Sequence, residues 1–164
     1  MPGQIALDSK YYPADFNLTT VLIPTIATSG GVGMVNVPVV YADKPIVIDS
    51  LRLFTAQRLD NGDGDTTDSH EFTFWVVTNT AVPTGTASST QIQLTDVVSV
   101  AESVNAAQTF SFTIRSTGTT AANVIPAGAT VWMRSTVPST ATASTWTVGH
   151  TTGSFISMRW RSQL

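Results

Sequence analysis

Cysteine is absent from the chain, and charged side chains are scarce. The 164 residues include no Cys, two Lys and six Arg, and charged residues make up only 12% of the total. Without Cys the chain has no disulfide framework, no thiolate zinc site and no Cys nucleophile. Duplex nucleic acid is bound mainly by neutralising its phosphates. The few scattered basic residues and a net charge of −3 therefore predict no nucleic-acid partner.

Long apolar runs are also missing. No stretch of the sequence reaches the roughly 18 apolar residues that a membrane helix needs. The first sixteen residues, MPGQIALDSKYYPADF, lack the basic and apolar regions of a signal peptide. We therefore expect no membrane partner, and synthesis and assembly in a cytoplasm.

Hydroxyl side chains take the place of the missing charges. The chain has 27 Thr and 16 Ser, and the β-branched Thr favours strands. A surface with so little charge tends to associate, which suits a protein whose function is to assemble with others. We therefore expect a homo-oligomer, a dimer or a trimer.

Apolar and polar residues alternate with a period of two from residue 35 onward, and helical periodicity is nearly absent. Turns rich in Gly, Pro, Ser, Thr and Asn separate roughly eight such segments. The expected strands are 35–41, 46–54, 72–77, 92–100, 109–116, 130–136, 145–150 and 154–162. Short strands at this spacing predict an all-β fold, an antiparallel β-sandwich of jelly-roll type.

Three strands carry local irregularities that can be predicted. Pro38 cannot donate to a β-ladder, so segment 35–41 is expected at a sheet edge or with a bulge. The apolar face of segment 46–54 changes parity in its middle, which predicts a bulge near Asp49 and Ser50. Segment 92–100 is either one bent strand or two short ones.

The first 34 residues differ from the rest, with three Pro, four Gly and no sustained alternation. They are predicted to form an extended N-terminal arm that lies across a neighbour or over its own sheet. Residues 35–164 then make up the sandwich domain. On this interpretation, removing residues 1–30 leaves a folded sandwich but weakens its binding to a partner.

Residues 59–71, LDNGDGDTTDSHE, are strongly acidic. The candidate metal ligands are Asp60, Asp63, Asp65, Asp68 and Glu71. An EF-hand that starts at Asp60 has Glu71 at position 12, but Gly62 and Gly64 occupy positions that need side-chain oxygens. Two interpretations stay open: a hairpin loop, since Asn-Gly and Asp-Gly favour turns, and a less regular calcium site. Calcium is thus the one cofactor considered.

No enzyme is expected. The sequence has no G-x-S-x-G nucleophile motif, and its titratable residues are sparse outside the acidic segment. The four tryptophans, Trp75, Trp132, Trp146 and Trp160, all fall in predicted strands, where a core or subunit-interface position is expected. Exposed indoles would instead suit sugar binding.

Two C-terminal stretches carry a resemblance. IPAGATVWMRST (125–136) and GSFISMRWRSQL (153–164) resemble small β-sandwich proteins of tailed-bacteriophage virions. The resemblance implies a non-enzymatic virion protein of the capsid decoration, or cement, type. Its partners would be the major capsid protein or other virion proteins. The alternative is a receptor- or glycan-binding module of a fibre or tail. No catalytic motif comes with the resemblance.

Overall fold

The structure is a computed structural model that describes residues 17–22, 26–29, 34–55, 69–101, 108–117, 120–121, 123–136, 145–148 and 155–163. Fourteen strands occur in these ranges: β1 Asn17–Leu22, β2 Ile26–Ser29, β3 Met34–Tyr41, β4 Ile46–Thr55, β5 Ser69–Val77, β6 Gln91–Gln93, β7 Val98–Ala101, β8 Gln108–Ser111, β9 Ser116–Thr117, β10 Thr120–Ala121, β11 Val124–Ile125, β12 Thr130–Thr136, β13 Thr145–Val148 and β14 Phe155–Ser162. The described part of the chain contains no helix able to cross a membrane.

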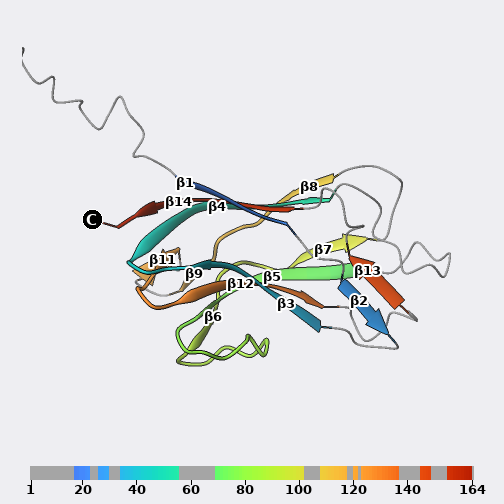
Figure 1. Cartoon of the computed structure of the whole chain (residues 1–164), viewed down its shortest axis with the longest axis horizontal. Coiled ribbons are helices and arrows are strands. Elements are labelled where there is room, and N and C mark those ends of the chain that lie inside the picture. Colours follow the sequence, from blue (N-terminus) through green and yellow to red (C-terminus); the bar gives the residue numbers. More distant parts are fainter. Residues whose placement is uncertain are drawn as a thin grey trace, which may run out of the picture.

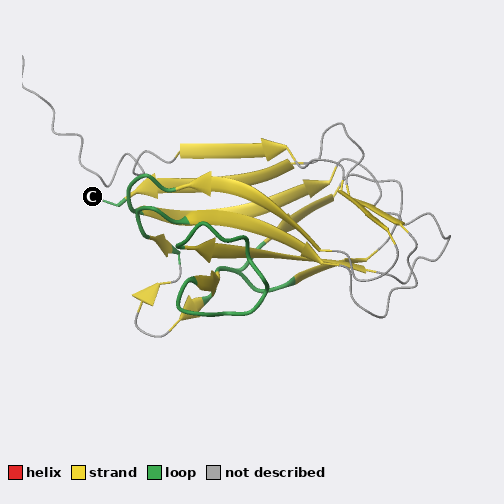
Figure 2. Cartoon of the chain, turned by 60° about the horizontal axis from the view of Figure 1, so that its bottom comes forward, coloured by secondary structure: helices red, strands yellow, loops and turns green. Residues whose placement is uncertain are grey.

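Two antiparallel sheets form the layers of a sandwich (Figures 1 and 2). The first sheet has the order β1-β14-β4-β11, and β8 also pairs with β4. The second has the order β3-β12-β5-β6, and β7 also pairs with β5. Two short pairs, β9 with β10 and β2 with β13, complete the pairings.

The connectivity is that of a jelly roll. Among the eight strands β1, β3, β4, β5, β7, β8, β12 and β14, the chain changes layer at every step except from β5 to β7. Numbered in chain order, one sheet has the sequence first, eighth, third, sixth, and the other second, seventh, fourth, fifth. Two interleaved four-stranded sheets of this kind define the jelly-roll architecture. The predicted all-β antiparallel sandwich is therefore confirmed.

The local irregularities lie where the sequence places them. Opposite β14, the register skips Asp49, so β4 has a bulge there and turns Ile48 and Leu51 to the same side. β3 is an edge strand, and its register with β12 skips Val39, next to Pro38. Segment 92–100 contains two short strands, β6 and β7, rather than one bent strand.

The core fills the space between the sheets. β5 is an interior strand of the second sheet, and its Phe74 packs edge-on against Phe112, with ring centroids 4.8 Å apart. Alternate residues of the long strands face inward, and the fully buried large side chains among the described residues are Phe72, Phe74, Ile46, Ile48, Leu51, Leu53, Leu94, Ile125, Met133, Ile156 and Met158.

Part of the predicted N-terminal arm belongs to the sandwich. Residues 17–22 form β1, which pairs along its whole length with β14. Val21 packs against the core, and the Trp160 indole Nε1 donates a hydrogen bond of 2.8 Å to Thr19 Oγ1. The alternation in NLTTVL is too short to stand out beside the neighbouring Pro and Gly residues. Residues 1–16 of the predicted arm lie outside the described residues.

Candidate functional site

The acidic segment is described only at its end. Glu71 is a half-buried residue of β5, opposite Thr136 of β12. β5 begins at Ser69, so the strand extends into the segment predicted as a loop. The other four candidate calcium ligands, Asp60, Asp63, Asp65 and Asp68, lie outside the described residues. Within the described ranges, no three His, Asp or Glu residues gather to hold a metal, and the calcium site stays a prediction.

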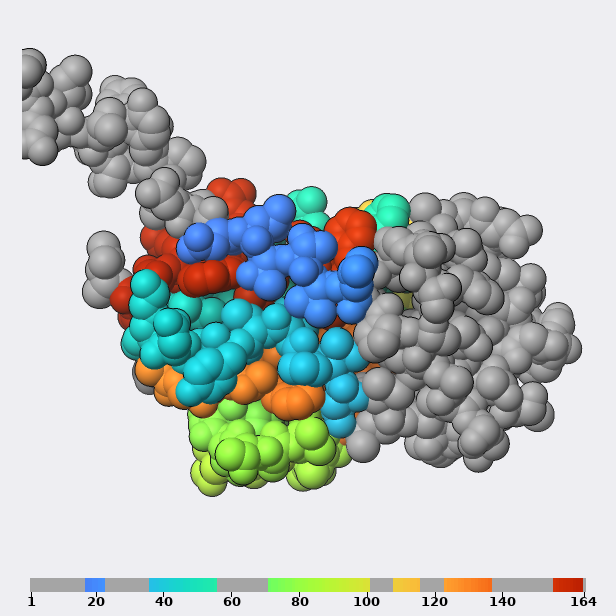
Figure 3. Space-filling view, in the orientation of Figure 1, coloured from blue at the N-terminus to red at the C-terminus, as the bar shows by residue number. Residues whose placement is uncertain are grey.

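A row of apolar side chains crosses the outer surface of the first sheet. Leu22 of β1 lies opposite Phe155 of β14, and Phe155 lies opposite Phe54 of β4. The Phe54 and Phe155 rings are stacked, with centroids 5.0 Å apart. Leu18 and Leu22 are 69% and 70% exposed, and β1 lies at the molecular surface (Figure 3). We call this surface the open face.

Arginines flank the apolar row on the open face. Arg159 lies opposite Leu18, and Arg52 lies two strand positions from the Phe pair. Arg159 also forms an exposed ion pair of 3.5 Å with Asp49. Arg and aromatic residues are enriched where proteins meet, and such residues dominate binding energies. The open face thus has the composition of a contact surface.

The outer surface of the second sheet carries two tryptophans and is covered by the chain itself. Trp75 of β5 lies opposite Trp132 of β12. Trp75 is only 4% exposed, and its indole Nε1 donates a hydrogen bond of 2.9 Å to Thr73 Oγ1. Residues 78–90, which connect β5 to β6, lie against β12 and β3 at the lower edge of Figure 3. We call this surface the covered face and residues 78–90 the cover loop.

Two side chains fasten the cover loop. Asn36 Nδ2 donates a hydrogen bond of 3.2 Å to the Pro83 carbonyl. The buried Gln91 side chain accepts hydrogen bonds from Thr84 N–H and Thr84 Oγ1 at 2.9 and 3.1 Å. Gln91 Nε2 also donates to the Val82 carbonyl at 3.4 Å. These contacts hold the middle of the loop on the sheet.

Beneath the cover loop lies Arg134, which pairs in register with Asn36 and Thr73. Burial lowers the pKa of the Arg134 guanidinium from its usual value, because removal from water disfavours the charged form. Gly85 sits against this guanidinium, and a Cβ added there would overlap it. Gly85 also has a φ of 86°, so both its backbone and its neighbour require glycine.

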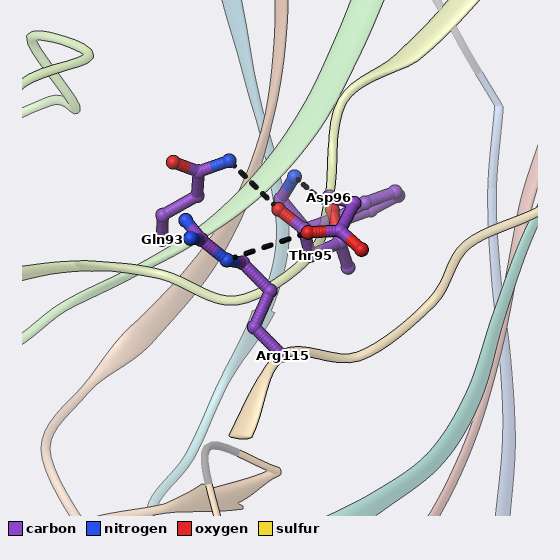
Figure 4. A network of polar contacts seen from close by, with 5 residues as sticks. Gln93, Thr95, Asp96 and Arg115 are labelled. Atoms are coloured by element: carbon purple, nitrogen blue, oxygen red, sulfur yellow. Dashed lines mark hydrogen bonds and ion pairs between the residues drawn. The ribbon is translucent and has the colours of Figure 1, made fainter. Parts of the chain in front are cut away.

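Another group of polar contacts connects the segment between β6 and β7 to β5 and to Arg115 (Figure 4). Thr95 Oγ1 accepts a 3.1 Å hydrogen bond from Phe74 N–H, and Gln93 Nε2 donates one of 2.8 Å to the Thr95 carbonyl. Arg115 and Asp96 form an exposed ion pair of 3.4 Å. The polar groups in Figure 4 thus bond to one another within the chain, which is the arrangement of a structural link.

The amino-acid sequence predicts part of each outer face. The alternation in 130–136 and 154–162 correctly puts Trp132 with Arg134, and Arg159 with Arg161, on outward positions. The open-face row was missed, since it requires the register of β1 with β14. The cover loop was missed because residues 78–90 have the composition of an ordinary polar turn.

Comparison with known proteins gives no family for the chain: no protein-family model matches it, and no curated protein matches it.

Proposed function

We propose that this protein is a non-enzymatic structural protein of a virion, and that it decorates and stabilises the head of a tailed bacteriophage. The proposal rests on the open face together with the resemblance of residues 125–136 and 153–164. Its partners are the major capsid protein or neighbouring virion proteins, and a second copy of the chain.

The open face is the observation that carries this proposal. Leu18 and Leu22 expose more than two-thirds of their surface. Leu22 lies next to the stacked Phe54 and Phe155, and Leu18 lies on the same face of β1, opposite Arg159. Clustered exposed apolar side chains mark interaction sites more often than single ones. A sheet surface with an apolar row and flanking arginines suits contact with another protein.

The fold and composition agree with an assembly role. Jelly rolls are common among viral capsid domains. A decoration protein that contacts several subunits at once gains avidity, because its later contacts are effectively intramolecular. Homo-oligomers with closed symmetry provide such multiple contacts, and they leave no unpaired self-association surface that could form open-ended filaments.

The alternative is a receptor- or glycan-binding module of a fibre or tail, and it depends on accessible indoles. Jelly rolls also occur among lectins. However, Trp75 is buried under the cover loop, and Trp160 is half-buried against Thr19. The side chain of Trp146 lies outside the described residues. The burial of Trp75 and Trp160 therefore favours the decoration role.

Antibody labelling of the source particle tests the location. We expect gold-labelled antibodies against the chain to mark the head in electron micrographs. Label on fibres or tail would favour the alternative, and absence of the chain from purified virions would contradict both.

Binding to purified heads that lack the chain tests the surface. We expect saturable binding by the full-length protein and loss of binding by a Leu18→Asp/Leu22→Asp variant, because charge on the apolar row opposes its burial. Val97 is 50% exposed and lies between β6 and β7, so Val97→Asp is the matched control and should bind normally. Equal binding by all three proteins would reject the open face as the contact surface.

A further inference from the structure

Among the residues that the structure describes, three buried polar atoms on the covered face have no hydrogen-bond partner. They are Asn36 Oδ1, Trp132 Nε1 and Arg134 Nη1. Native proteins pair nearly all of their buried polar groups, and each exception calls for an explanation. Three exceptions on one face of one sheet point to a common cause.

Strand register brings the three side chains to one place. Arg134 of β12 lies directly opposite Asn36 of β3, and Trp132 is two residues before Arg134 on the same strand. Directly opposed residues of antiparallel strands share a face, as do residues two apart. Trp75 lies opposite Trp132 and gives the site an apolar wall.

The chemistry of the three atoms defines what would satisfy them. The Trp132 indole and the Arg134 guanidinium are obligate donors. Asn36 Oδ1 is an acceptor, and its orientation is fixed because Asn36 Nδ2 donates to the Pro83 carbonyl. The matching group accepts two hydrogen bonds and donates one.

The charge of Arg134 restricts the chemical class of the ligand further. Arg134 carries a positive charge in a partly desolvated position, and within the described residues no ion pair reaches it. Glu71 lies on the same face, two residues beyond the position opposite Arg134, and no ion pair between Glu71 and Arg134 is found among the described residues. A buried charge is costly unless it is paired, and an Arg–carboxylate contact is among the strongest hydrogen-bonded pairs.

We propose that Asn36, Trp132 and Arg134 form a binding site for a carboxylate that carries an O–H or N–H group beside it. The carboxylate accepts from Trp132 Nε1 and Arg134 Nη1, and the adjacent O–H or N–H donates to Asn36 Oδ1. A sugar acid and the C-terminus of a peptide both present this pattern. The site is independent of the proposed role in the virion.

The cover loop controls access to this site. The three atoms are buried beneath a loop that the Gln91 side chain fastens through Val82 and Thr84. Opening requires the breaking of these bonds and of the Asn36–Pro83 bond, and it uncovers Trp75, while most residues of 78–90 are already exposed. Because Gly85 lies against the Arg134 guanidinium, a ligand reaches Arg134 Nη1 when the loop lifts.

Titration of the ¹⁵N-labelled full-length protein tests the proposal through the indole N–H signal of Trp132, assigned by its loss in Trp132→Phe. The probes are glycolate, acetate and glycolamide. We expect glycolate to give a saturable shift and acetate to bind about 3- to 10-fold more weakly, since it lacks the hydroxyl donor. Glycolamide, which lacks the charge, should give no saturable shift.

Two variants assign the contacts. Arg134→Gln should weaken glycolate binding about 10- to 100-fold, since it removes a charged hydrogen bond. Arg115→Gln, which alters an exposed arginine elsewhere, should leave binding unchanged. Asn36→Ala should bring the affinities for glycolate and acetate together, and this second readout holds even if Arg134→Gln does not fold.

The source of the natural carboxylate is resolved by gluconate and N-acetylglycine, which represent a sugar acid and a peptide C-terminus. Binding of either one, or of glycolate alone, supports the site and sets the size of its ligand. Absence of a saturable shift with glycolate would overturn the proposal, as would equal shifts with glycolamide or equal binding by Arg134→Gln. The three atoms would then be satisfied by a single water molecule, which also accepts two hydrogen bonds and donates one.

Discussion

The outer faces of the two sheets carry similar residue types but differ in how far these residues are covered by the chain. Each carries large apolar side chains beside arginine, Phe54 and Phe155 near Arg52 on the open face, and Trp75 and Trp132 near Arg134 on the covered face. On the covered face the chain supplies its own cover, residues 78–90, and Trp75 is 4% exposed. On the open face Leu18 and Leu22 remain more than two-thirds exposed.

This difference decides whether burial of each face stabilises the folded chain or its association with another surface. Covered-face tryptophans bury their surface within the folded chain, and therefore contribute to its stability. Open-face leucines contribute little in the single chain and become useful only when another surface covers them. Substitutions on the covered face should therefore change folding, and those on the open face should change association.

The largest expected effect is on the covered face. Trp75→Ala should lower the free energy of unfolding by about 3–5 kcal/mol, because it removes a buried indole and leaves a cavity. Phe54→Ala is the matched open-face variant and should cost only about 1–2 kcal/mol, since the Phe54 side chain is only half-buried. Urea unfolding of both proteins provides the comparison. Equal losses would mean that the open face is as well covered as the other.

Gly85 tests how closely the cover loop fits over Arg134. Gly85→Ala should cost about 2–4 kcal/mol, because Ala is strained at a positive φ and its Cβ overlaps the guanidinium. Gly128 has a similar φ of 82° with nothing near its absent Cβ. Gly128→Ala should therefore cost only the backbone strain, about 1–2 kcal/mol.

A thermodynamic cycle isolates the steric part of the Gly85 effect. In an Arg134→Ala background the guanidinium is gone, so Gly85→Ala should cost no more than Gly128→Ala does. An undiminished cost in that background would place the obstruction elsewhere in the loop.

Loss of the Gln91 hydrogen bonds that hold the cover loop should have a smaller effect on stability. Gln91→Ala removes three hydrogen bonds to Val82 and Thr84 and should cost about 1–3 kcal/mol. Hydrogen exchange at the Thr84 amide should then speed up more than exchange in β5. Gln93→Ala, which loses a single bond to the Thr95 carbonyl, is the control and should leave Thr84 unchanged. Equal protection of the Thr84 amide in both variants would show that Gln91 does not hold the loop in place.

The sequence predicts the sandwich well because alternation has a physical cause in each strand. The parity change around Asp49 and the ladder-breaking Pro38 were sufficient to predict two irregularities from the amino-acid sequence. β1 escaped prediction, since six residues of alternation next to Gly and Pro carry little signal. Truncation experiments should accordingly remove residues 1–16, because a deletion to residue 30 would also remove β1 from the sheet.

The candidate sites were less predictable, because they depend on proximity across strands. Residues 36, 85 and 134 are far apart in the chain and meet only through the β3–β12 register and the path of the cover loop. Nothing in the spacing of Asn36 and Arg134 signals that they face each other. The acidic segment showed the reverse: its composition was conspicuous, yet a calcium site needs a geometry that composition does not specify.

The smallest expected effect on folding is the most informative for the open face. Leu18→Ser and Leu22→Ser should each change the free energy of unfolding by less than about 0.5 kcal/mol, as is usual for exposed positions. Analytical ultracentrifugation should show that the double variant self-associates more weakly than the parent chain, because association is the step that covers these side chains. A loss of about 1 kcal/mol or more in the monomer would mean that the leucines already have partners within the chain. The open face would then be a second covered face, and the contrast between the two sheets would disappear.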